Sequence, residues 1–232
     1  NTFLQGSVGI FLNNGAADDG ELKISNNTCN GQYQGIYVAY VDSVEISGNT
    51  IAGDHNGIGI YVDSCNPAMI TGNKVTEFTE NQLSYGISLY NSNGNSSGER
   101  TVVANNMIKA YVHAIYLYDS DYSDIYYNTL INTYSSAGTS YGTLALQYVS
   151  YTNIKNNIIT NTSGGRLIIK LTSYPDMYFD YNMYYGGSAS NGFYSNNNPS
   201  VNGDFEDWQA AGLDSNGVLQ DPEFYSFGDG FH

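Results

Sequence analysis

The sequence predicts an all-β solenoid of about seven coils, because one short pattern returns along most of the 232 residues. The pattern is clearest in residues 35–51, where a run that starts Gly-Ile-x-Val leads through Asp-Ser to a closing apolar-x-x-Asn-x-apolar signature. The signature returns every 22 to 33 residues, with its asparagine at Asn27, Asn49, Asn73, Asn106, Asn128, Asn157 and Asn182. Self-similarity at such a period is typical of a solenoid.

Each repeat contains two short runs in which apolar residues alternate with period two, the period of a β-strand. The first run predicts these inward pairs: Ile36/Val38, Ile58/Ile60, Ile87/Leu89, Ile115/Leu117, Leu144/Leu146 and Leu167/Ile169. The second run predicts one inward residue three positions before an asparagine: Ile46, Ile70, Val103, Ile125, Ile154 and Phe179. No segment sustains the i, i+3, i+4 spacing of an amphipathic helix, which argues against helical repeats.

The repeated asparagines are expected at a corner of each coil. A corner residue has to tolerate left-handed backbone geometry and hydrogen-bond the local main chain, and asparagine does both. Coils stacked about 4.8 Å apart also allow the asparagines to bond one another in a ladder. We therefore predict that all seven are structural rather than catalytic.

These in-phase copies resemble the repeat of the right-handed parallel β-helix proteins, a pectate-lyase-like family of secreted and cell-surface proteins. The resemblance covers residues 8–185 and implies a right-handed, single-stranded parallel β-helix. The family includes lyases, epimerases, hydrolases, phage tailspikes and adhesins. Its function therefore has to be argued from a site rather than from the fold.

The predicted coils follow one another directly. The entry coil, residues 1–34, carries Ile10 and Leu12 inward, and residues 86–113 contain the longest insertion, at 91–100. The other coils occupy residues 35–56, 57–85, 114–141, 142–166 and 167–185.

After residue 186 the repeat pattern stops, so the sequence divides into coils (1–185) and a linker with a capping tail (186–232). Residues 191–199 are polar and asparagine-rich and are expected to form the linker. The tail contains Trp208 and Phe224. It resembles the segment that folds back over the open end of the last coil in many surface β-helix proteins. In that family the chain runs on further, so we expect a truncated tail and, as partners, neighbouring domains of a longer chain.

The chain is strongly acidic, with 7 lysine and arginine residues against 22 acidic residues and a formal net charge of −15. This argues against nucleic acid as a partner, because phosphates require a basic surface. It also argues against capture of an acidic polysaccharide, unless calcium bridges the carboxylates. The sequence has no run of 18 apolar residues, so no membrane span is predicted. A composition rich in Tyr, Gly, Asn and Ser suits a secreted or cell-surface protein.

Outward positions of the first run supply candidate binding residues. One predicted column reads Phe11, Tyr37, Gly59, Ser88, Tyr116, Ala145 and Ile168, and the next reads Asn13, Ala39, Tyr61, Tyr90, Tyr118, Gln147 and Lys170. Tyr61, Tyr90 and Tyr118, with Tyr37 and Tyr116, are therefore candidates for a strip that contacts sugar rings. The alternative is a tyrosine ladder that only stabilises the sheet. Beside this strip, Asp63, Asn91 and Asp119 are expected to form a column of turn residues.

The leading hypothesis is a non-catalytic extracellular module that binds a polysaccharide or cell-surface glycan, or forms a rigid stalk or adhesin. The alternative is a polysaccharide lyase or epimerase that acts on an acidic polysaccharide. Lys170, Arg166 and His113 are its candidate catalytic residues, and period two places Arg166 and Lys170 on one face. Calcium is the one candidate cofactor. Its candidate ligands are Asp119, Asp121 and Asp124, which lack the full pattern of an EF-hand loop.

Overall fold

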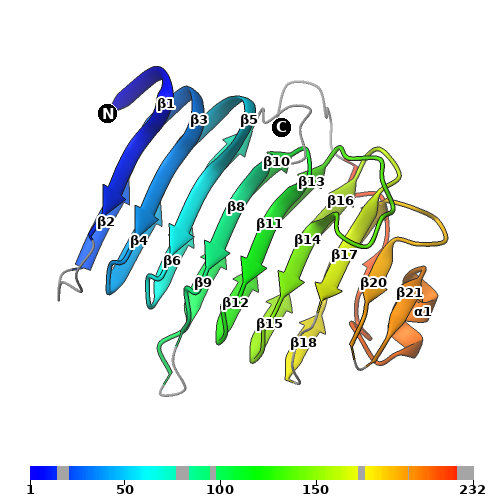
Figure 1. The fold of residues 1–232 in the computed structure, drawn as a ribbon. Coiled ribbons are helices and arrows are strands. Elements are labelled where there is room, and N and C mark those ends of the chain that lie inside the picture. Colours follow the sequence, from blue (N-terminus) through cyan, green and yellow to red (C-terminus); the bar gives the residue numbers. More distant parts are fainter. Residues whose placement is uncertain (15–20, 77–83, 95–97, 172–175, 198, 224–232) are drawn as a thin grey trace.

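The computed structural model describes residues 1–14, 21–76, 84–94, 98–171, 176–197 and 199–223, and describes only the backbone of 54–56. In these residues the strands stack into a parallel β-solenoid of about seven turns (Figure 1). The predicted all-β solenoid is therefore confirmed.

Each coil contributes strands to three faces. The first face contains the C-terminal parts of β1 (Thr2–Asn13), β3 (Thr28–Ala39) and β5 (Thr50–Asp63), then β8 (Tyr85–Tyr90), β11 (His113–Tyr118), β14 (Gly142–Gln147), β17 (Arg166–Leu171) and β20 (Phe193–Ser195). The second face contains β2 (Glu21–Ser25), β4 (Ser43–Ser47), β6 (Ala68–Thr71), β9 (Thr101–Ala104), β12 (Ser123–Tyr126), β15 (Thr152–Lys155) and β18 (Met177–Asp180). The third face contains the N-terminal parts of the three long strands, then β7 (Lys74–Thr76), β10 (Met107–Ala110), β13 (Thr129–Asn132), β16 (Ile158–Asn161), β19 (Met183–Gly186) and β22 (Val218–Leu219).

The inward residues of the first face stack in two buried columns. One column reads Ile36, Ile60, Ile87, Ile115, Leu144 and Ile168, and the other reads Val38, Val62, Leu89, Leu117, Leu146 and Lys170. Stacking like residues on successive coils buries one continuous apolar core along the solenoid.

Two of the predicted inward pairs are wrong. The pair Ile58/Ile60 is shifted by two residues, because the sequence holds two successive Gly-Ile pairs and the second, Ile60, aligns with Ile36. The pair Leu167/Ile169 is shifted by one residue, because a run of three apolar residues hides the parity of the strand. The second-face column is confirmed, since these residues pair in register and are buried: Ile46, Ile70, Val103, Ile125, Ile154 and Phe179.

The signature asparagines form the predicted ladder. From Asn27 to Asn157, each backbone N–H and each Nδ2 donates to the Oδ1 of the next asparagine at 2.9–3.1 Å. The left-handed residue, however, is the exposed one before each asparagine: Asn26, Gly48, Gly72, Asn105, Tyr127, Asn156 and Tyr181. The prediction of left-handed asparagines is wrong, because their side chains must point inward to reach one another.

The tail closes the C-terminal end of the solenoid. Within the segment predicted as a linker, β20 adds a rung to the first face by pairing parallel to β17. The chain then returns through β21 (Val201–Gly203), the strand antiparallel to β20, and α1 (Phe205–Ala210) (Figure 1).

Trp208 of α1 lies over the last coil, as predicted. It is completely buried, and its ring centroid is 5.1 Å from that of Phe179 and 5.3 Å from that of Phe193. Asp214 ends the asparagine ladder by accepting a hydrogen bond from Asn182 Nδ2 at 2.7 Å. The predicted contribution of Phe224 lies outside the described residues.

Candidate functional site

An aromatic ladder runs along the solvent side of the first face. It consists of Phe11, Tyr37, Tyr61, Tyr90, Tyr118 and Tyr148, and successive ring centroids are 4.9–5.5 Å apart. Because parallel strands repeat at about 4.8 Å, one ring on each coil is enough to keep the rings in contact.

The sequence predicted that Tyr61, Tyr90 and Tyr118 lie in one column, and this prediction is wrong. Tyr61 pairs with Tyr37 and Ser88, whereas Tyr90 pairs with Asp63 and Tyr118. The small side chain of Ser88 leaves a gap in the first column, and the ring of Tyr61 instead contacts that of Tyr90 at 5.5 Å.

The same register shift corrects the column of turn residues. Ser64, rather than Asp63, occupies the corner equivalent to Asn91 and Asp119, because the backbone N–H of each donates to the last residue of the next first-face strand.

Most ring faces in the first part of the ladder are covered. The planes of Phe11 and Tyr37 differ by 17°, and those of Tyr37 and Tyr61 differ by 13°. Nearly parallel rings in contact hide the faces that they turn toward each other, so Tyr37 and Tyr61 are half-buried, whereas Phe11 at the end of the ladder stays 61% exposed. This part of the ladder therefore stabilises the sheet face and offers little surface on which a sugar ring could stack.

A cavity of about 610 Å³ opens at Ala145, the position after Tyr116 at which the first column has no aromatic side chain. After Tyr116 the column continues with Ala145 and Ile169. The apolar lining of this Ala145 cavity includes Ala145, Ile169 and Leu171, and its aromatic lining includes three half-buried tyrosines: Tyr85, Tyr116 and Tyr141.

Hydrogen bonds fix the polar groups of the Ala145 cavity. The Tyr116 hydroxyl donates to Gln147 Oε1 at 2.9 Å. His113 Nδ1 lies 2.7 Å from the carbonyl oxygen of Gly142, a contact that requires a proton on Nδ1. Burial lowers the pKa of His113 to about 4, so its ring is neutral near pH 7. The cavity thus presents uncharged donors and acceptors beside aromatic rings.

Arg166 fixes the loop that supplies one side of the cavity. This loop, residues 133–141, connects β13 to β14 and contributes Ser140 and Tyr141 to the lining. Arg166 Nε donates to the carbonyl oxygens of Ala137 and Gly138 at 2.8 and 3.1 Å. Its Nη1 and Nη2 donate to Phe193 O and Asn202 Oδ1, and its guanidinium lies 5.0 Å from the centre of the Tyr194 ring. Arg166 therefore joins the loop to the tail.

The predicted outward position of Lys170 is wrong, because the strand is shifted by one residue: Lys170 lies beside Leu146 in the inward column and is buried, and Leu171 lies beside Gln147. Burial lowers the pKa of its ammonium group. Arg166 and Lys170 both lie on strand β17 and on the same face of it, as the sequence predicted. Neither side chain lines the Ala145 cavity.

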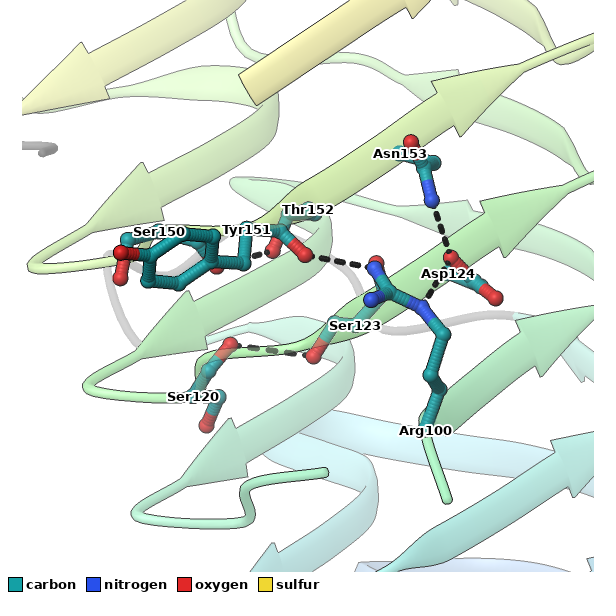
Figure 2. Close-up of polar contacts among 8 residues, drawn as sticks. All are labelled: Arg100, Ser120, Ser123, Asp124, Ser150, Tyr151, Thr152 and Asn153. Atoms are coloured by element: carbon teal, nitrogen blue, oxygen red, sulfur yellow. Dashed lines mark hydrogen bonds and ion pairs between the residues drawn. The ribbon is translucent and has the colours of Figure 1, made fainter. Parts of the chain in front are cut away.

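One of the predicted calcium ligands, Asp124, belongs to a different cluster, on the second face (Figure 2). Arg100 Nε donates to Asp124 Oδ1 at 2.7 Å, and Asn153 Nδ2 donates to the same oxygen at 2.7 Å. Asp121 Oδ1 accepts from the backbone N–H of Ser150 at 2.6 Å, and Asp119 is exposed at its corner. Among the described residues, no group of three or more His, Cys, Asp or Glu side chains gathers as a metal site would require.

The structure brings two predicted site residues, Tyr116 and His113, together in one cavity. It assigns four others to the ladder: Tyr37, Tyr61, Tyr90 and Tyr118. Sequence reasoning proposed none of the other eight lining residues as site residues, among them Tyr85, Tyr141, Ala145 and Gln147. The small Ala145 after Tyr116 was a visible signal of a gap. Tyr85 and Tyr141 do not belong to the predicted outward columns, so the sequence pattern gave no signal for them.

Comparison with known proteins gives one family. The sequence model of the NosD family, described as "Periplasmic copper-binding protein (NosD)", matches residues 1–165. No curated protein and no solved structure matches the chain. The periplasm lies outside the cytoplasm, in agreement with the predicted location. No helix of the described residues is long and apolar enough to cross a membrane. Because the match covers more than half of its length, the chain belongs to the NosD family of β-helix proteins.

Proposed function

We propose that the protein is a non-catalytic, carbohydrate-binding module that acts outside the cytoplasm and holds a glycan in the Ala145 cavity. One observation carries the proposal: the aromatic column is interrupted at Ala145, and a cavity of about 610 Å³ lies there among three tyrosines. A sugar ring in this cavity takes the place that an aromatic ring takes on other coils. The volume is within the range of about 300–1,000 Å³ that is usual for ligand pockets.

The chemistry of the lining suits a sugar. The C–H face of a pyranose packs against aromatic and aliphatic surface, here Tyr116, Tyr141, Ala145 and Ile169. Its hydroxyl groups pair with neutral side chains such as Gln147. In this proposal Tyr37, Tyr61, Tyr90 and Tyr118 make the face rigid, and the partner is a polysaccharide or cell-surface glycan.

The alternative, a polysaccharide lyase or epimerase, has less support. A lyase must stabilise the negative charge that develops beside a substrate carboxylate, which requires a cation at the reacting group. Arg166 already donates to two loop carbonyls, to Phe193 O and to Asn202 Oδ1. Lys170 lies in the inward column, and burial makes His113 a weak base with a pKa of about 4.

The description of the family names copper, but the described histidine and cysteine side chains do not fit a copper centre. Copper is held by thiolate, thioether and imidazole groups. Cys29 and Cys65 are free and completely buried, and burial raises the pKa of the Cys65 thiol to about 11. His113 is the one histidine whose side chain the structure describes, and it is buried, so no pair of imidazoles is available among the described side chains. The described residues gather no cluster of three or more His, Cys, Asp or Glu side chains, and the proposal includes no copper.

The proposal is tested by filling the cavity. Ala145→Tyr restores a ring after Tyr116, so we expect it to abolish retention on polysaccharide while leaving the melting temperature unchanged or higher. Ala145→Ser, which keeps the cavity open, and Tyr151→Ala, on the exposed second-face side, serve as controls and should retain the wild-type behaviour. Retention is measured by affinity electrophoresis in gels that contain hydroxyethylcellulose, galactomannan, galactan, pectate or alginate.

Two outcomes contradict the proposal. Retention of the wild type on none of the gels refutes carbohydrate binding, and retention that persists in a folded Ala145→Tyr protein moves the binding site elsewhere. Ultraviolet absorbance of unsaturated products, recorded with and without calcium, provides the parallel test for a lyase. Product that disappears in Lys170→Met or Arg166→Lys would favour the enzyme alternative.

A further inference from the structure

Among the residues that the structure describes, the lining of the Ala145 cavity carries no formal charge at neutral pH. Among the described residues, its polar lining consists of Tyr85, His113, Tyr116, Ser140, Tyr141 and Gln147. Burial raises the pKa of Tyr85 and Tyr116 and lowers that of His113, so each of these three side chains is neutral near pH 7. The described lining is therefore polar but holds no counter-ion for an anionic or a cationic ligand.

The two cations on β17, Arg166 and Lys170, are both buried. Arg166 donates to the loop carbonyls of Ala137 and Gly138 and to acceptors of the tail. Lys170 takes the inward position that Leu146 takes one coil earlier. Neither of them is among the residues that line the cavity.

We propose that the Ala145 cavity selects uncharged sugars and rejects uronates, an inference that rests on the proposed carbohydrate-binding function. A carboxylate that enters the cavity leaves water without meeting a cation, and burying an unpaired charge is unfavourable. The formal charge of −15 adds long-range repulsion against any polyanion. A neutral sugar meets neither cost, because its hydroxyl groups exchange hydrogen bonds with water for hydrogen bonds with tyrosine, serine and glutamine side chains.

Matched ligand pairs test the selection. Cellotetraose, mannotetraose and β-1,4-galactotetraose are each compared with the derivative oxidised at C6 to the uronate, by calorimetric titration of the full chain at pH 6. At this pH the uronates are ionised and His113, with a pKa of about 4, is neutral. For the neutral member that binds, we expect the uronate to bind at least about tenfold more weakly, a lower limit for the cost of an unpaired buried charge.

A charge introduced into the cavity should change the preference. Gln147→Lys places an ammonium group in the lining, and we expect it to reduce the difference between the paired ligands to about threefold or less. Ser215→Lys makes the same change of net charge at an exposed position in the tail and should leave the wild-type ratio unchanged.

Each result has a distinct meaning. Uronates that bind as tightly as the neutral sugars, or more tightly, overturn the selection while carbohydrate binding stands. Binding of no member of the panel refutes the proposed function and this inference with it. A change in the ratio that Ser215→Lys reproduces shows that overall charge, and not the lining of the cavity, sets the preference.

Discussion

Replacing Trp208 with alanine is expected to lower the free energy of unfolding by about 3–5 kcal/mol, the range for large aromatic side chains removed from a core. Trp208 is completely buried between Phe179 and Phe193, which belong to the last rungs of two different faces. The substitution also uncovers the end of the solenoid, where unpaired strand edges can join another molecule. The urea midpoint should therefore fall, and light scattering should detect association.

Glu206→Ala is the matched control for this prediction. Glu206 is exposed in the first turn of the same helix, and its removal should cost less than about 1 kcal/mol. An unchanged urea midpoint and a monomeric Trp208→Ala protein would show that the tail is not needed to close the solenoid.

Replacing Asn128 with alanine is expected to cost about 3–5 kcal/mol, because a buried polar group left without a partner costs roughly 1–3 kcal/mol and several are left at once. Asn128 Oδ1 accepts from the backbone N–H and the Nδ2 of Asn106. Its own Nδ2 donates to Val103 O and Asn157 Oδ1. The substitution interrupts the ladder at the fifth of its seven asparagines, and chemical denaturation measures the loss.

Asn30→Ala is the control for the ladder. Asn30 is exposed on β3 and does not belong to the ladder, so its replacement should change stability by less than about 0.5 kcal/mol. If the two variants unfold at the same urea concentration, the asparagine ladder contributes no more than surface asparagines do.

Much of the fold could be predicted from the sequence because the repeat is itself the physical cause of the fold. Stacked coils require like residues at like positions, and Ile46, Asn49 and their equivalents recur at a fixed spacing of three. Register failed where the local pattern is ambiguous. The doubled Gly-Ile before Tyr61 and the apolar run before Lys170 each allow two alignments, and only the pairing with neighbouring coils decides between them.

The candidate site was less predictable because it depends on an interruption of the repeat. Tyr116 and His113 stood out by residue type, but the space over Ala145 arises from a residue that is small. The loop that supplies Tyr141 is fixed by Arg166, whose acceptors are mostly backbone carbonyls, and such contacts leave no mark in the sequence. Arg166 was therefore interpreted from its charge as a catalytic candidate, whereas its contacts join a loop to the tail.

The most direct test of the glycan site is a crystal structure of the protein soaked with the neutral oligosaccharide that it retains most strongly. We expect electron density for a sugar ring in the Ala145 cavity, with its C–H face against Tyr116 or Tyr141 and a hydroxyl group bonded to Gln147. The sugar should occupy the position of the missing ring after Tyr116. Density along the edges of Tyr37 and Tyr61, or on the second face beside Tyr151, with none in the Ala145 cavity, would contradict this assignment.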